Sequence, residues 1–168
     1  TYYDPDTGAF GALGHGVNDI DTAQLMPLER GGVLSASVTD VKKGKKGEPG
    51  ELHGVFDTEG EDIGTLTANT SHGIFGTLTT GELTAMEPVE VAEAEQVKTG
   101  KAIIYSNVSG EEVRAYEVEI TKLFPHAEDG RDMMVKVTDP ALLEATGGIV
   151  QGMSGSPILQ DGRLVGAV

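Results

Sequence analysis

The chain has 168 residues, of which 27 are acidic and 12 are basic, so its formal net charge is −15. This charge disfavours binding to nucleic acid and to anionic lipid surfaces, because like charges repel. Cysteine is absent, which excludes disulfide bonds, a thiolate nucleophile and a zinc site with cysteine ligands.

Glycine content and length favour a single all-β unit. The chain contains 24 glycines, several of them beside strand-like runs, a pattern typical of tight turns between strands. The length is enough for one sizeable hydrophobic core. No run approaches the roughly 18 apolar residues of a membrane span, and Thr1–Asp4 has no signal-peptide character.

The first part of the chain predicts two pairs of strands. Thr1–Tyr3 and Ala9–Leu13 flank a turn rich in proline and glycine. A second pair, 32–39 and 52–56, is joined by the basic, glycine-rich segment 42–50. We expect that segment to be an exposed and mobile loop.

The rest of the chain predicts more short strands and one helix. The strand-like runs are 63–66, 73–78, 86–91, 102–105, 113–120 and 133–137. The run from Val113 alternates apolar and polar residues, as expected for a strand with one solvated face. Residues 140–145 predict a helix with Asp139 at the N-cap and a glycine pair at its end. Many short strands separated by turns predict a sandwich or barrels.

One internal boundary is suggested by the acidic segment 90–100. It would divide the chain into halves of approximately 1–90 and 91–168. The valines of that region, at 89, 91 and 97, could equally belong to strands.

A candidate nucleophile lies in Gly152-Met153-Ser154-Gly155-Ser156-Pro157. A catalytic serine needs an exposed hydroxyl beside backbone N–H groups that stabilise an oxyanion, and small neighbours permit the tight turn this requires. Two apolar runs around Gln160–Arg163 follow it and predict a hairpin that supports the loop. The same residues would also suit an ordinary turn between strands.

Serine catalysis needs a base, and the chain has four histidines. His15 is the best candidate, because glycines flank it at the end of an apolar run. His53 in a strand-like run and His126 in a polar loop are interpreted as structural or surface residues. His72 lies in a predicted turn, and we interpret it as a turn residue.

A carboxylate would complete the set by orienting the imidazole and stabilising its protonated form. The aspartates weighed for this role are Asp19, Asp21, Asp40, Asp57 and Asp139. Asp139 follows a predicted strand and is the nearest of them to Ser154 in the sequence. From the residues alone, a helix N-cap is the slightly better interpretation of Asp139.

Two blocks closely resemble the peptidase domain of the SpoIVB family: Tyr3–Pro5 with Gly11–His15, and Thr146–Pro157. Segments 47–50 and 73–78 also resemble it, so the resemblance covers nearly the whole chain. It implies a chymotrypsin-like double β-barrel and serine endopeptidase activity.

The resemblance also assigns the site. It implies that His15 is the base, Ser154 the nucleophile and Asp139 the acidic member, although Asp139 lies much nearer the serine than in chymotrypsin. By analogy with chymotrypsin-like enzymes, the backbone N–H groups of Gly152 and Ser154 would form the oxyanion hole. Ser156 would be a turn residue, and no metal or organic cofactor is needed.

The resemblance to the SpoIVB family also implies a location and a substrate for this chain. They are made in the forespore, secreted across its inner membrane, and cleave a membrane-associated regulator. This cleavage releases an intramembrane protease that processes a sigma-factor precursor. We therefore expect an extracytoplasmic protein with a protein substrate.

SpoIVB-like proteins usually carry an N-terminal membrane anchor and a PDZ domain as well, so we expect this chain to be an excised peptidase domain. We also expect it to stop before the last strands of the second barrel. A sheet edge exposed there would be able to pair with another chain.

Two other classes of function remain open at this point. A non-catalytic β-barrel, or a pseudo-peptidase, could bind a peptide strand by edge addition. An acidic scaffold could bind a basic partner through salt-sensitive contacts, an interpretation that rests only on the net charge.

Overall fold

The computed structural model describes residues 1–79, 87–127 and 130–168. Within those ranges the chain consists mainly of antiparallel strands, with one short α-helix and a single 3-10 turn at Ala94–Gln96. The predicted all-β class with one short helix is confirmed, and the arrangement is consistent with a chymotrypsin-like fold. No helix in the described ranges is long and apolar enough to cross a membrane.

The first sheet has five strands in the order β1-β2-β7-β6-β3. They are β1 (Tyr2–Tyr3), β2 (Ala9–Leu13), β3 (Gly32–Val33), β6 (Gly64–Thr70) and β7 (Gly73–Leu78). The predicted pairing of the first two runs is confirmed, with Tyr2 opposite Gly11. A Cβ on Gly11 would lie 2.7 Å from the Tyr2 ring atom Cζ, so glycine leaves the space that the ring fills.

The second sheet has the order β10-β9-β8-β11-β12. Its strands are β8 (Gly100–Asn107), β9 (Val113–Leu123), β10 (Met133–Val137), β11 (Pro157–Gln160) and β12 (Arg163–Ala167). The predicted alternation from Val113 is confirmed, because Tyr116, Val118 and Ile120 are buried between exposed neighbours. The main hydrophobic core of the described residues lies against this sheet.

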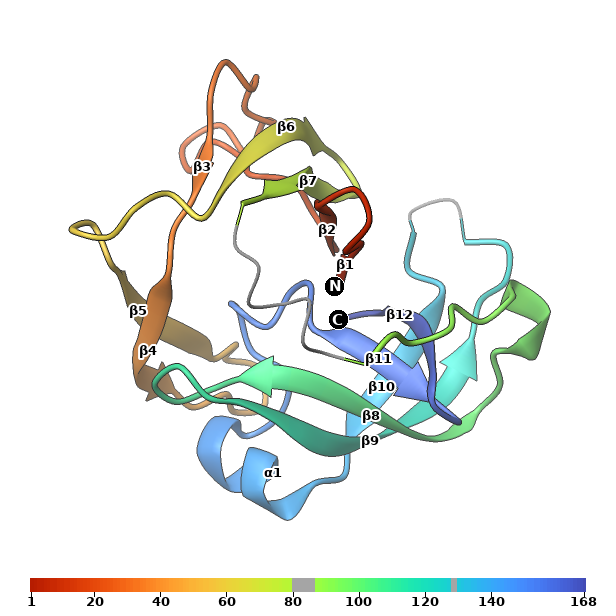
Figure 1. Ribbon diagram of the computed structural model, residues 1–168. Coiled ribbons are helices and arrows are strands. Elements are labelled where there is room, and N and C mark those ends of the chain that lie inside the picture. The colour runs from red at the N-terminus through yellow and green to blue at the C-terminus, as the bar shows by residue number, and fades with distance from the viewer. Residues whose placement is uncertain (80–86, 128–129) are drawn as a thin grey trace.

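A two-stranded hairpin, β4 (Ala36–Lys42) with β5 (Glu51–Phe56), runs between the two sheets at the left of Figure 1. The predicted single strand 32–39 is wrong, because β3 and β4 belong to different sheets. Most of segment 42–50 is exposed, as expected. Gly50 is buried, however, and the Gly44 N–H donates to the Thr146 carbonyl at 2.8 Å.

The helix α1 (Pro140–Thr146) lies beneath β9 in Figure 1 and begins as predicted. Asp139 is its N-cap and Pro140 opens its first turn, where a missing N–H has no cost. Gly147 ends the helix with φ 76°, a left-handed conformation that favours glycine.

The segment between the two sheets does not show the strand predicted at 86–91. Met86 lies outside the described residues, and 87–91 form no strand. Val91 makes a single parallel bridge with Leu164 of β12. The first sheet ends at Leu78 and the second begins at Gly100, and the division near residue 90 stays a prediction.

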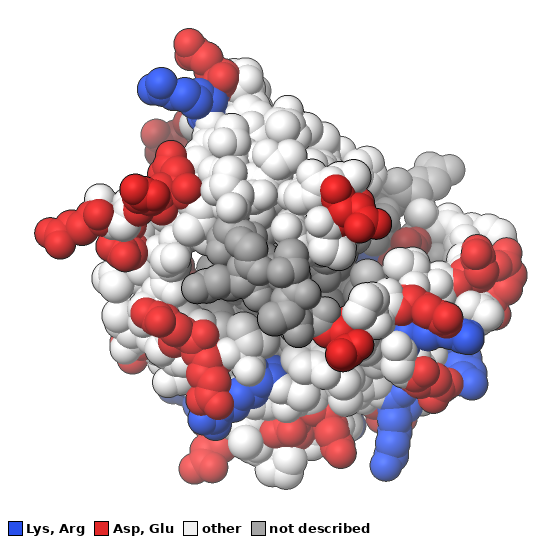
Figure 2. All heavy atoms as spheres, viewed as in Figure 1, with Lys and Arg blue, Asp and Glu red and all other residues white. Residues whose placement is uncertain are grey.

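Acidic side chains are spread over the surface. Figure 2 shows Asp and Glu around the whole rim of one face, with fewer Lys and Arg among them. Exposed ion pairs join Lys98 to Asp161 at 3.2 Å and Arg163 to Glu90 at 3.1 Å. Such pairs contribute little to stability in water.

Candidate active site

A tight turn leads into Ser154. The Met153 N–H donates to the Val150 carbonyl at 3.2 Å, and Gly152 stands third in this turn with φ 96°. A turn that needs positive φ at its third residue favours glycine there. Met153 is only 1% exposed, so its side chain anchors the loop in the hydrophobic core.

A second turn follows directly. The Ser156 N–H donates to the Met153 carbonyl at 3.1 Å, and Gly155 is third in this turn with φ 88°. Ser154 lies between the two glycines and is exposed. The Ser156 hydroxyl donates to the Ser106 hydroxyl at 3.1 Å, so Ser156 has the structural place predicted for it.

Two backbone donors lie next to the Ser154 side chain along the chain, at Gly152 and at Ser154 itself. Neither the Gly152 N–H nor the Ser154 N–H donates a hydrogen bond within the described ranges. Both residues are exposed. Preorganised donors of this kind stabilise the negative oxygen of a tetrahedral intermediate.

His15 follows β2 and is exposed. Its Nδ1 lies 2.9 Å from the carbonyl oxygen of Gly16. A carbonyl only accepts hydrogen bonds, so Nδ1 must carry the proton in this contact. The neutral ring then has an unprotonated Nε2, the form that a general base requires.

Asn69 of β6 holds the loop that follows His15. Its side chain accepts from the Val17 N–H at 2.8 Å and donates to the carbonyls of Val17 and Met26, both at 2.9 Å. A Cβ on Gly16 would lie 2.6 Å from the Asn69 side-chain oxygen, so glycine permits the close approach. Sequence reasoning missed Asn69, because no local pattern pairs it with a residue 52 positions away.

The structure brings His15 and Ser154 together. Both line a pocket of about 450 Å³, which Asn18 and Ile74 also line. Gly14, which directly precedes His15, lies close to Ser154, because a Cβ placed on Gly14 would be 3.6 Å from the Ser154 Cβ. No hydrogen bond joins His15 to Ser154 within the described ranges.

Asp139 is engaged elsewhere. One carboxylate oxygen accepts from the N–H groups of Ala141 at 2.9 Å and Leu142 at 3.0 Å, and the other from Glu117 at 3.3 Å. The Leu142 N–H is the main reason why the pKa of this carboxyl is lowered. Asp139 does not line the pocket of His15 and Ser154, so its place beside His15 stays a prediction.

Three of the other residues weighed above, Asp19, Asp57 and His72, have local partners. Asp19 accepts from the Thr22 hydroxyl at 2.8 Å, which is the first cause of the lowered pKa of its carboxyl. Asp57 caps a turn by accepting from the Gly60 N–H at 3.0 Å. His72 contacts the Ser71 hydroxyl at 3.1 Å in a turn, as predicted.

A comparison with protein-family models shows to which family the chain belongs. The family model for SpoIVB peptidase S55 matches residues 1–168. The chain belongs to the SpoIVB peptidase family. No curated protein and no solved structure matches the chain.

The predicted resemblance to SpoIVB peptidases is thus confirmed over the whole chain, and with it the class of sporulation serine peptidases. The family match alone does not assign catalytic roles to individual residues. Those roles rest on the geometry of the loop around Ser154 and on the resemblance of its motif.

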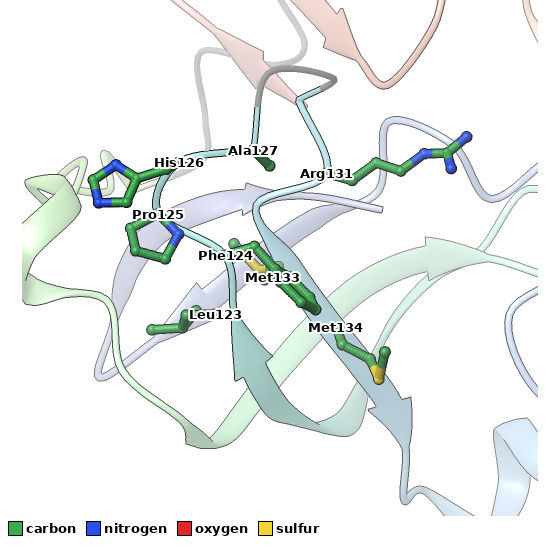
Figure 3. A pocket seen from close by; sticks show the side chains of 8 residues that line it. All are labelled: Leu123, Phe124, Pro125, His126, Ala127, Arg131, Met133 and Met134. Carbon is green, nitrogen blue, oxygen red and sulfur yellow. The ribbon is translucent and has the colours of Figure 1, made fainter.

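This SpoIVB family member has a second pocket, of about 700 Å³, where β9 passes into β10 (Figure 3). Phe124, Met133 and Met134 contribute apolar surface, and Lys122 lies over the Phe124 ring at 4.7 Å. His126 is exposed on this loop, as predicted. None of the candidate catalytic residues lines this pocket.

In the part of the chain that the structure describes, no group of three or more His, Asp or Glu side chains could bind a metal ion.

Proposed function

We propose that this SpoIVB-type domain is a serine endopeptidase with Ser154 as nucleophile and His15 as general base. One observation carries the proposal. An exposed serine lies between two positive-φ glycines, beside two backbone N–H groups without described acceptors, in the same pocket as a histidine. This combination meets the needs of acyl transfer.

The reaction would proceed through an acyl-enzyme. Nε2 of His15 takes the Ser154 hydroxyl proton as the oxygen attacks the peptide carbonyl. The N–H groups of Gly152 and Ser154 bind the resulting oxyanion. His15 then donates its proton to the leaving amine, and water hydrolyses the ester by the same steps.

The Gly16 carbonyl supports this assignment, because it holds His15 in the tautomer that leaves Nε2 free. A carbonyl carries no net charge, so it stabilises the protonated ring less than a carboxylate does. Asp139 is proposed for that second task on the resemblance alone. To stabilise the protonated ring, the Asp139 carboxylate would have to interact with His15. In the structure it accepts N–H groups in the first turn of α1.

Family membership supports a proposed substrate and location. We infer that the substrate is a membrane-associated regulatory protein outside the cytoplasm, in the space into which the forespore secretes. Its cleavage would release an intramembrane protease that processes a sigma-factor precursor. The full-length protein would also carry a membrane anchor and a PDZ domain.

A pseudo-peptidase that binds peptides is the second candidate. It is favoured by the lack of a described hydrogen bond between His15 and Ser154. Catalytic hydrogen bonds are often long before substrate binds, so the lack of this bond is also compatible with a peptidase.

Incubation with an unfolded protein such as casein tests the proposal. We expect the parent chain to cut casein into fragments that are visible by mass spectrometry, and Ser154→Ala to leave casein intact. Casein that binds the folded parent but stays whole would contradict the peptidase proposal and favour the pseudo-peptidase.

A further inference from the structure

The peptide unit between Gln151 and Gly152 is tied to the β4–β5 hairpin. The Leu52 N–H donates to the Gln151 carbonyl at 2.9 Å, and the Gln151 N–H donates to the Gly50 carbonyl at 3.0 Å. These two bonds form a parallel bridge between Glu51 and Gln151. The loop that leads to Ser154 therefore runs as a short partner strand of β5.

This pairing controls a donor of the candidate oxyanion hole. In a trans peptide the C=O and the following N–H point in opposite directions, and the described chain has no cis peptide bonds. Because the Gln151 carbonyl faces β5, the Gly152 N–H must face away from β5. A half-turn of this unit would exchange the two groups and put an acceptor where the donor stands.

Gly152 by itself does not fix that orientation. Glycine populates both signs of φ with similar ease, and Gly152 has φ 96°. The Leu52 side chain packs over it, since a Cβ on Gly152 would lie 3.0 Å from the Leu52 Cβ. The hydrogen bond and this packing both come from one residue of the hairpin.

We propose that the β4–β5 hairpin holds the oxyanion loop in its catalytic orientation, with Leu52 as the positioning residue. Leu52 acts through the Gln151–Gly152 peptide unit and touches no reacting atom. The proposal rests on the proposed peptidase function and names a part of that site that lies outside the triad and the serine motif.

The hairpin is anchored well enough for this role. At its tip, the Gly44 N–H donates to the Thr146 carbonyl at 2.8 Å, beside the end of α1. In its middle, Val38 and Gly110 exchange hydrogen bonds of 2.8 and 2.9 Å. In Figure 1 the hairpin lies at the left, and both anchors join it to the part of the chain that carries the second sheet and α1.

Leu52→Pro is the direct test, because proline lacks the N–H that holds the Gln151 carbonyl. This N–H points away from β4, so the pairing with β4 keeps its hydrogen bonds. Leu52→Val is the matched control, since it keeps the N–H and an apolar side chain. Circular dichroism and urea unfolding establish that each variant is folded.

Two reactions separate the oxyanion hole from the rest of the site. Phosphonylation of Ser154 by a fluorophosphonate uses the oxyanion donors, whereas alkylation of His15 by iodoacetamide does not. We expect Leu52→Pro to slow phosphonylation by about 10²-fold, the typical effect of losing one donor. Alkylation of His15 should keep the parental rate, and Leu52→Val should resemble the parent in both reactions.

A folded Leu52→Pro variant that is phosphonylated at the parental rate overturns the inference and leaves the peptidase proposal intact. A parent chain that is not phosphonylated removes the peptidase proposal and this inference with it. If Leu52→Pro does not fold, Gly50→Ala decides by the same criteria. A Cβ on Gly50 would clash with the backbone of Lys42 and Gly44 and lie 2.6 Å from Val150 Cγ1. Gly54→Ala on the exposed part of β5 is its control.

Discussion

Asp139 has one role in the contacts of the structure and a second by resemblance. Its carboxylate accepts two N–H groups of the first turn of α1. Asparagine can accept the same bonds, but alanine cannot. We therefore expect Asp139→Ala to lower the free energy of unfolding by about 1 kcal/mol, and Asp139→Asn to change it little, as measured by urea unfolding.

The kcat of the folded Asp139→Asn variant tests the second role. If Asp139 is the acidic member of a triad, kcat falls by about 10⁴, the typical effect of such a change in a Ser-His-Asp triad. A parental kcat would contradict the triad assignment and leave Asp139 as a helix cap.

The lowered pKa of Asp139 also predicts a pH effect. A carboxyl with a folded-state pKa below its unfolded value stabilises the fold above the unfolded pKa, here 3.8, and loses that contribution as the pH falls through the folded pKa. The parent should therefore lose stability relative to Asp139→Asn between neutral pH and pH values below 3.8. Urea unfolding of both proteins at several pH values measures this, and parallel curves would contradict it.

Asn69 is expected to matter for the base as Leu52 does for the oxyanion loop. Asn69→Ala removes the three hydrogen bonds that hold Val17 and Met26, so the loop after His15 should loosen and fluorophosphonate labelling should slow. Gln160→Ala is the matched control, because the Gln160 side chain also makes three hydrogen bonds, to Lys98 and Lys101, and does not line the pocket. Equal labelling rates of the two variants would contradict a positioning role for Asn69.

At the scale of elements, the candidate site depends on the two turns around Ser154. Gly152→Ala and Gly162→Ala both place a side chain at positive φ, at 96° and 78°, which costs about 1 kcal/mol or more in each. A Cβ on Gly152 also meets Leu52 at 3.0 Å, whereas one on Gly162 meets nothing within 4 Å. We expect both variants to lose stability, Gly152→Ala more than Gly162→Ala, and we expect a loss of kcat only in Gly152→Ala.

Elements with local signals could be predicted from the sequence. Helix α1 has its cap, proline and glycine within a few residues, and the hairpin β11–β12 turns at Asp161 and Gly162 with positive φ at both. The break between β3 and β4 had no such signal, because it depends on which distant strand each one pairs with.

The same distinction holds for the candidate site. The glycines around Ser154 and His15 are local signals of exposed, tight loops, and the structure brings those loops to one pocket. Leu52 and Asn69 act through contacts with residues far away in the sequence. Such pairing depends on the assembled sheets, so a single sequence gives no sign of it.

For the molecule as a whole, the central claim is that two loops from different sheets form a nucleophile and its base. Both ends of the described chain also reach this region, since the Thr1 hydroxyl donates to the Gly155 carbonyl at 2.9 Å and the Gly155 N–H donates to Val168 at 3.0 Å. The proposed peptidase site therefore depends on the whole fold, and no single element supplies it.

The most direct test is the intact mass of the folded parent after incubation with a fluorophosphonate, beside Ser154→Ala and His15→Ala. The account predicts a single adduct on the parent and none on either variant at the same exposure. A folded parent that forms no adduct, or an adduct that persists in Ser154→Ala, would contradict it.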